Sequence, residues 1–382
     1  MTFFLTALTL VALGFGVRVL LRMIRSAGGS PLAGDPPTVA AGLVSAIVPV
    51  LDEEARVGAA LAALQRCGPE VREILVVDGG SRDGTAGIVA AAAAADPRIR
   101  WIDASPVPAE WNGKAWGIAC GLRAASAEAA YVATIDADVR VSPRLFAAML
   151  AKRETEDLTA LSVATKQELG DWLEGLLHPA FLCTLVYRFG LPNVRAGSVG
   201  GVQANGQCFL ARRETLLETE AVALSRDSRC EDVTIARALV ARGYGVGFYE
   251  GEDAVTVRMY ANGAELWRNW PRSLPMRDRF VAPAGGLAEV FFVQALPLPL
   301  ALAFTLLGAT TPLAHAAFGA SVGLVMMRLG TLAGMRRAYA NPPLTYWLSP
   351  LADLAVVYAL AASVMRRTAA WRGRTLVAEH SA

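Results

Sequence analysis

The sequence lacks a strong excess of charge of one sign, and it lacks any regular cysteine spacing. Its 382 residues carry 36 Lys and Arg against 34 Asp and Glu, so the net charge is only +2. Such a balance does not support a broad basic surface, and we expect no nucleic-acid partner. The five cysteines form no CxxC pair or other metal-like spacing. We interpret them as small buried residues of a reducing compartment rather than a disulfide framework.

Charged residues are scarce overall, at 18% against 54% hydrophobic residues, which is too apolar for a wholly soluble protein. The region from about residue 36 to 279 has an ordinary soluble composition, and both flanks are apolar. In residues 1–25 the charges Arg22 and Arg25 follow the apolar run. This order predicts a retained membrane anchor whose following side is cytoplasmic, not a cleaved signal peptide. Residues 26–42, rich in Gly and Pro, are interpreted as a linker.

The carboxyl-terminal region contains three apolar stretches that are close to the length of a membrane span, Leu287 to Leu307, Pro312 to Met327, and Pro350 to Met365. Basic residues after the second stretch and after the third both indicate a cytoplasmic side, which one further full span cannot provide. The last segment is therefore re-entrant or interfacial, or the positive-inside bias is weak at one place. We expect transmembrane or re-entrant helices over 287–365, a basic cytoplasmic tail over 366–382, and a multi-pass protein of the cell (inner) membrane.

Strand-like and helix-like segments alternate in the central region. Strands are expected over Leu43 to Val50, Glu73 to Val77, Arg100 to Ile102, and Tyr131 to Ile135, with helices between them. This alternation predicts an open, mostly parallel α/β sheet that binds a nucleotide at the carboxyl edge of its strands. A dinucleotide-binding domain is disfavoured, because the first strand is followed by Pro49 to Glu54 without the glycines of G-x-G-x-x-G.

The stretch from Tyr131 to Asp138 is an apolar run that ends in two carboxylates, Asp136 and Asp138. Hard oxygen ligands at the end of a buried strand suit Mg²⁺ or Mn²⁺ that carries a diphosphate. In the alternative interpretation, the two aspartates cap a turn into a helix that starts near Pro143. The sequence of this stretch alone leaves both interpretations open.

Several motifs resemble family 2 glycosyltransferases of the GT-A fold over about Ser45 to Leu274. They are Ile47-Val48-Pro49 with Glu53-Glu54, Val77-Asp78-Gly79-Gly80-Ser81 with Asp83-Gly84-Thr85, and Asp136-Ala137-Asp138. Further segments resemble the membrane-bound carotenoid and hopene-associated subgroup: Trp111 to Trp116, Arg258-Met259-Tyr260, Glu265-Leu266-Trp267, Trp270 to Leu274, and Trp371 to Arg374. The resemblance implies a Rossmann-like mixed sheet of the nucleotide-diphospho-sugar transferase type, flanked by transmembrane helices, with a cytoplasmic catalytic domain over 43–280.

The resemblance also implies a donor site for a UDP-sugar. Its residues would be Asp138 on the divalent metal, Asp136 on the ribose or a metal-bound water, Asp78 on the uracil edge, Pro49 to Glu53 around the nucleoside, and Lys114 on the diphosphate. Two alternatives stay open: Asp78 fixes a turn, and Lys114 is a solvated lysine at a helix start. Many relatives have a second aspartate where Gly79 stands, so one nucleotide contact is lost or replaced by backbone.

On the acceptor side, Cys230-Glu231-Asp232 resembles the family's T/G-E-D motif. The resemblance implies Asp232 as the base that takes the proton of an acceptor hydroxyl, with Glu231 positioning the acceptor. Alternatively, both are first-turn acids of a helix over Val233 to Arg242, and the two interpretations are compatible. Gln207, Trp270 and Arg272 are the residues that the resemblance assigns to acceptor binding.

The segment from Trp172 to Pro192 is apolar and aromatic, interrupted by His178, Pro179 and Arg188. We expect an interfacial helix pair that places the active site against the bilayer, with a buried core helix as the alternative. His178 has no partner residues in the sequence that would make it a metal ligand.

These features predict a membrane-anchored, metal-dependent inverting glycosyltransferase. It would move one hexose, glucose from UDP-glucose, to a polyprenoid lipid such as a carotenoid; the Q-x-x-R-W signature of processive synthases is absent. A hopanoid or polyprenyl-phosphate acceptor is the close alternative. A non-catalytic membrane scaffold with a nucleotide-binding fold is the alternative from another class.

Overall fold

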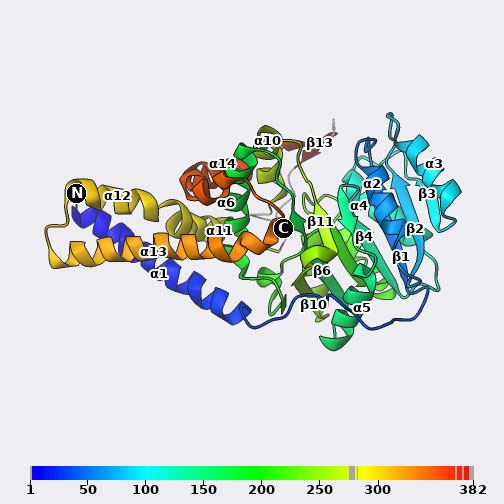
Figure 1. Cartoon of the computed structure of the whole chain (residues 1–382), viewed down its shortest axis with the longest axis horizontal. Helices are drawn as coiled ribbons and strands as arrows, with labels where there is room; N and C mark the ends of the chain where they lie inside the picture. The colour runs from blue at the N-terminus through cyan, green and yellow to red at the C-terminus, as the bar shows by residue number, and fades with distance from the viewer. Residues whose placement is uncertain (1, 275–279, 282, 366–367, 372–373, 378–382) are drawn as a thin grey trace.

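The computed structural model describes residues 2–274, 280–281, 283–365, 368–371 and 374–377. A sheet with its covering helices occupies one end of the molecule, and long helices extend from it to the other end (Figure 1). The main sheet of the described residues has the strand order β3-β2-β1-β4-β9-β6-β10-β8. Two smaller sheets have the orders β5-β11-β7 and β12-β13.

The first half of the main sheet is parallel, as expected. Its strands are β1 (Val44–Val50), β2 (Val71–Asp78), β3 (Ile99–Asp103) and β4 (Tyr131–Ile135), connected by the helices α2 (Val57–Gln65), α3 (Thr85–Ala95) and α4 (Gly113–Ala124). β1 and β4 are buried almost throughout, which explains their unbroken apolar sequences. All four strands end at one edge, and the predicted strand positions are confirmed to within two residues.

The second half of the sheet is mixed. It contains β6 (Ala160–Ala164), β8 (Val194–Arg195), β9 (Cys208–Arg212) and β10 (Val246–Glu250). Because β9 runs antiparallel to β4, Cys208 pairs with Ile135, and the residues before β9 meet those after β4. The Asp136 N–H donates to the Gln207 carbonyl over 3.3 Å. This crossing brings together two candidate site residues that lie far apart in the sequence.

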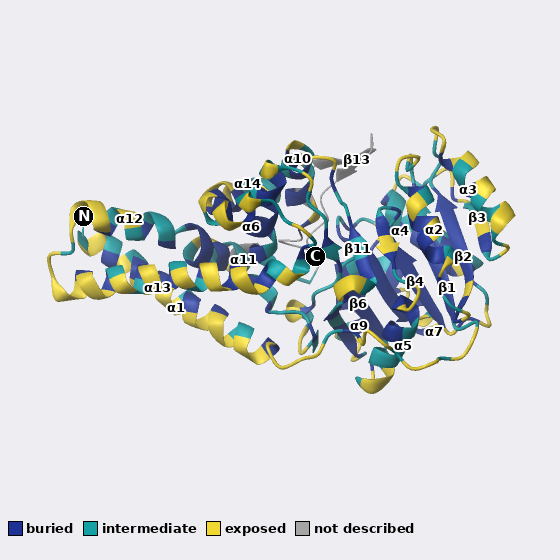
Figure 2. Ribbon diagram, in the orientation of Figure 1, coloured by how far each residue is buried: buried dark blue, intermediate teal, exposed yellow. Residues whose placement is uncertain are grey.

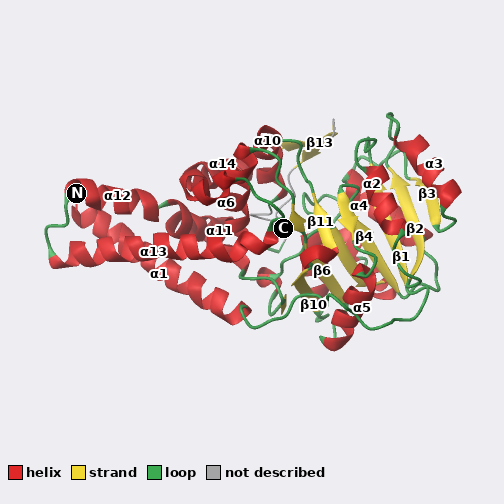
Figure 3. Ribbon diagram, in the orientation of Figure 1, coloured by secondary structure: helices red, strands yellow, loops and turns green. Residues whose placement is uncertain are grey.

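Helices cover both faces of the sheet (Figure 3). One apolar core joins the strands to α2, α3 and α5 (Leu145–Thr155). The other joins them to α4, α7 (Arg213–Glu218), α8 (Ala221–Leu224) and α9 (Glu231–Ala241). The strands between these two layers are buried (Figure 2), so the open carboxyl edge is the place where polar side chains gather.

The extension consists of α1 (Thr2–Ser26), α12 (Pro297–Leu307) and α13 (Pro312–Met335) (Figure 1). Its far end holds the amino terminus and the α12–α13 turn, where Leu5 packs against Phe304 and Ala314. Its near end contacts the sheet region: the Leu191 N–H donates to Ser26 Oγ over 2.8 Å, and Arg337 pairs with Glu250 at 3.0 Å. α1 and α13 therefore both run toward the sheet.

A second group of helices lies between the extension and the sheet. It comprises α6 (Trp172–Phe189), α10 (Gly263–Ser273), α11 (Pro283–Val290), a 3-10 segment η5 (Leu344–Ala352) and α14 (Asp353–Met365). A π-helical turn η3 (Phe291–Ala295) joins α11 to α12 with a bend of 43°. Among the described residues, three helical segments are long and apolar enough to cross a membrane, Thr2–Ser26, Pro312–Ala338 and Leu344–Met365, and the bent pair would be a fourth.

The structure corrects the expected helix pair over 172–192. α6 is a single helix with Pro179 inside it, started by a capping box of Asp171 and Glu174 and ended at Gly190. The helix continues past Pro179 because tertiary packing holds it: Phe181 and Tyr187 are fully buried. The buried-helix alternative describes this segment better. The tail over 366–382 lies largely outside the described residues.

Candidate functional site

A cavity of about 1280 Å³ lies at the carboxyl edge of the sheet and continues between the helices. Its polar part is lined by residues that follow β1 and β4, that precede β9 and that start α4 and α9. Its other part is lined by apolar residues of α1, α6 and α13, namely Met23, Leu182, Leu185, Val186, Phe189, Met327 and Met335. One cavity therefore joins the sheet edge to the helical extension.

Two loops at the donor end of the cavity are held together by hydrogen bonds. The Asp52 N–H donates to Ser81 Oγ at 2.9 Å, and the Arg82 N–H donates to Asp52 Oδ1 at 2.8 Å. The loop after β1 thereby packs against the loop after β2, and it brings Pro49 and Glu53 to the cavity wall. The predicted contact of these two residues with a nucleoside stays a prediction.

Asp78 is buried at the end of β2, and both of its carboxylate oxygens accept the Ser81 N–H at 3.0 Å. The alternative in which Asp78 fixes a turn is therefore observed. Its neighbour Gly79 lines the cavity, and Gly80 adopts a φ of 99°, which favours glycine. Pairing of Asp78 with a uracil edge stays a prediction.

Asp136 and Asp138 lie at the end of β4, on the cavity wall. The strand β5 (Val139–Val141) follows them, and α5 begins only at Leu145 without a side-chain cap. The interpretation of the two aspartates as helix caps is therefore wrong. Asp138 Oδ1 is buried and accepts no hydrogen bond from the described residues. Burial, together with the negative charge of Asp136, raises the pKa of Asp138 to about 7.

Lys114 connects the two acidic groups of the site. Its Nζ lies 2.7 Å from Asp136 Oδ1 and 2.9 Å from Glu231 Oε1, and its side chain is only 20% exposed. It is therefore not a solvated lysine. Burial alone would lower the pKa of Lys114, but the carboxylates of Asp136, Glu231 and Asp232 outweigh it and hold the pKa well above its usual value. A permanent positive charge thus lies at the centre of the cluster.

The start of α4 sets the position of Lys114. Asn112 is the N-cap of this helix, and its Oδ1 accepts the Lys114 N–H at 3.1 Å. The Asn112 amide also donates to the Ser228 carbonyl at 2.9 Å, just before α9. Asn112 therefore ties the lysine helix to the segment that carries Glu231 and Asp232, a link that no sequence motif indicated.

Glu231 and Asp232 form the first turn of α9, as the helix interpretation predicted, and both line the cavity. Carboxylates are favourable at a helix amino terminus. Burial, with the adjacent charge of Glu231, nevertheless raises the pKa of Asp232 to about 7. A carboxylate with such a pKa can both accept and release a proton near neutral pH.

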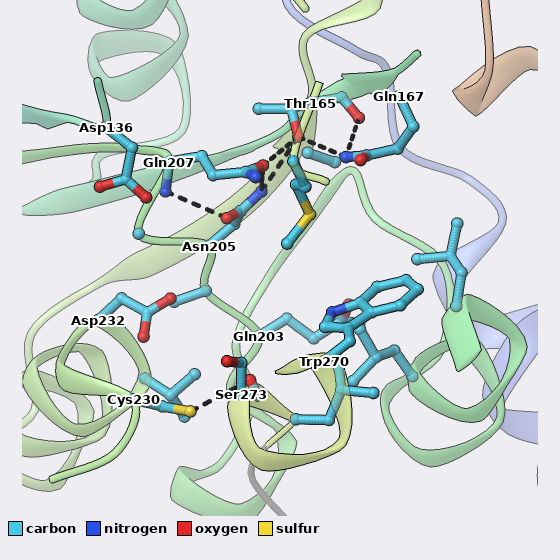
Figure 4. A pocket seen from close by; sticks show the side chains of 18 of the residues that line it. Asp136, Thr165, Gln167, Gln203, Asn205, Gln207, Cys230, Asp232, Trp270 and Ser273 are labelled. Atoms are coloured by element: carbon cyan, nitrogen blue, oxygen red, sulfur yellow. Dashed lines mark hydrogen bonds between the residues drawn. The ribbon is translucent and has the colours of Figure 1, made fainter. Parts of the chain in front are cut away.

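Gln207 belongs to a polar network on the opposite wall of the cavity (Figure 4). Its Oε1 accepts from the Asn205 amide at 2.9 Å and from the Thr165 hydroxyl. The Gln167 amide donates to the Thr165 hydroxyl at 2.8 Å. Sequence reasoning found Gln207 but missed the other three, since Thr165 and Gln167 come from β6 and its continuation.

Trp270 lies on α10 and faces the cavity (Figure 4). Its ring packs 4.0 Å from the ring of His178, centroid to centroid, and 5.4 Å from that of Phe181. The structure thus places Trp270 at the end of the cavity nearest the helices. Arg272 belongs to the same helix, but its side chain lies outside the described residues.

The residues at the sheet edge fit a divalent cation that arrives with a diphosphate. Among the described residues, no group of three or more His, Cys, Asp or Glu side chains could hold a metal ion by itself. Mg²⁺ and Mn²⁺ sites of nucleotide enzymes typically use one or two carboxylates and take further oxygens from phosphate and water. The buried, unpartnered Oδ1 of Asp138 is a free oxygen ligand of this kind.

Comparison with known proteins defines the class. Residues 45–217 match the model of glycosyl transferase family 2. The chain is a family 2 glycosyltransferase, and its mixed sheet has the GT-A fold. No sequence among curated proteins matches it significantly.

Solved structures of glycosyltransferases are similar in fold. The mannosyltransferase PcManGT from Pyrobaculum calidifontis, in complex with GDP-Man and Mn²⁺, is 18% identical with a TM-score of 0.55, over 94% of this chain and 98% of the other. TarS 1–349 from S. aureus, with UDP-GlcNAc, is 13% identical over 88% and 97%, with a TM-score of 0.43. Glucosyl-3-phosphoglycerate synthase from Mycobacterium tuberculosis, with Mn²⁺ and UDP, is 18% identical over 67% and 81%, with a TM-score of 0.39.

Proposed function

We propose that the protein is a membrane-bound, metal-dependent inverting glycosyltransferase that moves a single hexose from a nucleotide sugar to a polyprenoid lipid. The donor we propose is UDP-glucose, and the acceptor is a hydroxyl or carboxyl of a lipid such as a carotenoid. One observation carries this proposal: a single cavity joins the carboxylate cluster to an apolar wall of α1, α6 and α13. A sugar donor at one end and a lipid at the other would meet beside Asp232.

In the proposed reaction, Asp232 takes the proton of the acceptor hydroxyl while its oxygen attacks the anomeric carbon. The bond from that carbon to the diphosphate breaks, so a glycoside with inverted configuration and a nucleoside diphosphate leave. Glu231 and Lys114 hold each other at 2.9 Å and would keep the base in place. The raised pKa of Asp232 supports its assignment as the base.

A divalent cation would be held by Asp138, with Asp136 beside it. When bound, such an ion stabilises the negative charge that grows on the leaving diphosphate. The contact of Lys114 with Asp136 places a second positive charge next to the same position. The Mn²⁺ in the structures of PcManGT and of glucosyl-3-phosphoglycerate synthase agrees with a divalent cation here.

The charges of the cavity favour a neutral acceptor over a polyprenyl phosphate. Nine carboxylates line the cavity against five basic side chains, counting the described residues. Three of the basic side chains pair with carboxylates that line it as well: Lys114 with Asp136, Lys166 with Asp253, and Arg337 with Glu250. A second phosphate, besides that of the donor, would meet a surplus of negative charge.

The proposed membrane orientation follows from the helices. Large apolar side chains are exposed along α1, α12 and α13, as expected for surfaces that face lipid. Arg22 and Arg25 near the end of α1, and Arg336 and Arg337 after α13, are at the end of the extension nearest the sheet. The positive-inside rule then places the catalytic domain in the cytoplasm.

Under this orientation, the last apolar segment is interfacial. η5 and α14 pack against α6 and α10 beside the sheet region, not along the extension. Their exposed side chains include Trp347 and Tyr358, residue types that favour the membrane–water interface. The basic residues before η5 and after α14 can then lie on the same side, which reconciles the two positive-inside signals.

A transfer assay with detergent-purified protein tests the function. UDP-glucose with Mn²⁺ would be offered with a hydroxylated carotenoid, a carotenoid carboxylic acid, a hopanoid or a polyprenyl phosphate, and Asp232→Asn would serve as control. We expect one glucose on the neutral carotenoid and none with Asp232→Asn. Transfer only to the polyprenyl phosphate would overturn the acceptor class. GDP-mannose and UDP-GlcNAc as donors separate a wrong sugar from a scaffold without any transfer.

A further inference from the structure

His178 occupies the junction between the polar and the apolar part of the cavity. Its side chain is only 2% exposed, and its Nδ1 lies 2.9 Å from the Tyr339 hydroxyl. Its Nε2 is buried and has no hydrogen-bond partner among the described residues, although His178 lines the cavity. Buried nitrogen atoms rarely lack a partner, so this atom is available to a molecule that fills the cavity.

The position of His178 on α6 defines what that molecule looks like. Leu182, Leu185, Val186 and Phe189 follow it at helical spacing, and all of them line the cavity. One face of α6 thus begins with an imidazole and continues as apolar side chains. Such a stripe matches a ligand with a polar group at one end of a long apolar body.

The polar wall of the cavity ends at the same histidine. Gln167, which bonds to Thr165 in the Gln207 network, forms a β-bridge with Tyr339, the partner of His178. The Ala340 N–H also donates to the Gln167 carbonyl at 3.0 Å. His178 is therefore fixed by the backbone that carries the polar wall, and beyond it the wall is apolar.

The charge state of His178 narrows the ligand further. Burial lowers the pKa of its imidazole to about 3, so the ring is neutral at neutral pH. A neutral ring carries one N–H donor and one nitrogen acceptor and offers no positive charge to a phosphate. A hydroxyl or carbonyl oxygen is the partner that such a ring can bind in a closed, apolar setting.

We propose that His178 is a specificity-determining residue that binds, through Nε2, a neutral oxygen at the polar end of the lipid acceptor. This inference rests on the proposed function, because it requires a lipid in the cavity. His178 acts as a positioning residue: it holds the polar end of the lipid where α6 meets the polar wall, and it takes no proton from the reacting hydroxyl.

Two substitutions separate the two ring nitrogens. His178→Gln keeps a polar atom near Nε2 and loses the Nδ1 contact, while His178→Asn keeps an atom near Nδ1 and loses Nε2. The probes are a long-chain isoprenoid alcohol and its parent hydrocarbon, and the readout is thermal stabilisation of the full chain in defined micelles. We expect His178→Asn to bind the alcohol about tenfold more weakly and His178→Gln to stay within about threefold of wild type, the range of one neutral hydrogen bond.

Stabilisation by UDP and Mn²⁺ in the same samples reports the donor site and the fold. Equal alcohol affinity in wild type and His178→Asn would overturn the inference, and so would equal response of the wild type to alcohol and hydrocarbon. If the alcohol binds through His178 but no hexose is transferred to any neutral lipid, the inference stands and the proposed function fails. The kinetic counterpart is a raised KM for the acceptor with nearly unchanged kcat in His178→Asn.

A measurement on the wild-type histidine covers the case in which His178→Asn does not fold. The sequence has only three histidines, His178, His315 and His380, so ¹⁵N labelling of histidine gives few signals. His315→Gln and His380→Gln assign the remaining one. The alcohol, but not the hydrocarbon, should shift the Nε2 resonance of His178, and an unmoved resonance would contradict the proposal.

Discussion

Two buried groups of opposite charges, one at the sheet edge and one among the helices, differ in a way that separates a reactive site from a structural ion pair. In the first, Lys114 faces several carboxylates, and Asp138 keeps an unpartnered oxygen. In the second, Arg328 of α13 pairs with Asp353 of α14 at 2.9 and 3.0 Å.

The helix pair is balanced and closed by its neighbours. Ser349 accepts from Arg328 at 3.2 Å, and the Gln294 amide donates to Asp353 at 2.7 Å. Arg328 and Asp353 lie outside the described lining of the cavity, whereas Lys114 and Asp138 belong to it. A surplus of carboxylates at a cavity wall indicates a place for a cation and a substrate, and one-to-one pairing indicates packing.

The largest effect is expected for Asp138→Asn. Loss of the carboxylate removes the proposed metal ligand, and we expect transfer to fall by about a thousandfold or more, since a metal ion supplies several kcal/mol of charge stabilisation. Asp253→Asn is the matched control, because Asp253 lines the mouth of the cavity but is 86% exposed. Similar activity of the two variants in a transfer assay would remove the basis of the comparison.

Asp232→Asn should reduce kcat by about a hundredfold to ten-thousandfold, the range of a general base. Binding of nucleotide and metal should persist, since Asp232 is assigned to the acceptor and not to the donor. Single-turnover kinetics and UDP titration measure the two quantities separately. Retained turnover would assign the proton transfer to another group.

Arg328→Met should act on stability and not on chemistry. Removal of one partner leaves the other charge buried, which costs about 3–5 kcal/mol. Thermal unfolding of the wild type, of the single variant and of Arg328→Met with Asp353→Leu measures this cost, and the double variant should regain most of it. If the single variant instead loses activity at an unchanged Tm, the helix pair is part of the active site.

The pH dependence gives the smallest effect. With a pKa of about 7, Asp232 must be deprotonated to act, so transfer should rise about tenfold per pH unit below 7 and level off above it. Stability moves the opposite way: the raised pKa contributes stability below about pH 4 that is lost as the pH rises through 7. Asp232→Asn should remove this part of the pH dependence of Tm in metal-free protein.

The sequence predicted the donor half of the site better than the acceptor half. β1, β2 and β4 are apolar runs that end in motif residues, so Pro49, Asp78 and Asp138 could be placed at one edge from local patterns. The antiparallel position of β9 depends on long-range pairing, and no local pattern contains it.

The acceptor half arises from contacts between distant segments. His178 and Tyr339 are 161 residues apart, and Thr165 meets Gln207 only because β6 pairs with β9. Side chains such as Asn112 and Asn205 became visible as site residues only through their hydrogen bonds. The apolar run of α6 gave a helix, but tertiary packing decided that it is one buried helix.

The most direct test of the central claim is thermal unfolding of detergent-purified protein with UDP, with and without Mn²⁺, for the wild type and Asp138→Asn. At a hundred times its dissociation constant, a ligand stabilises the folded state by about 2.7 kcal/mol. We predict a metal-dependent rise in Tm for the wild type that Asp138→Asn lacks. No metal-dependent rise with UDP, or with GDP in its place, would contradict the assignment of the carboxylate cluster as the donor site.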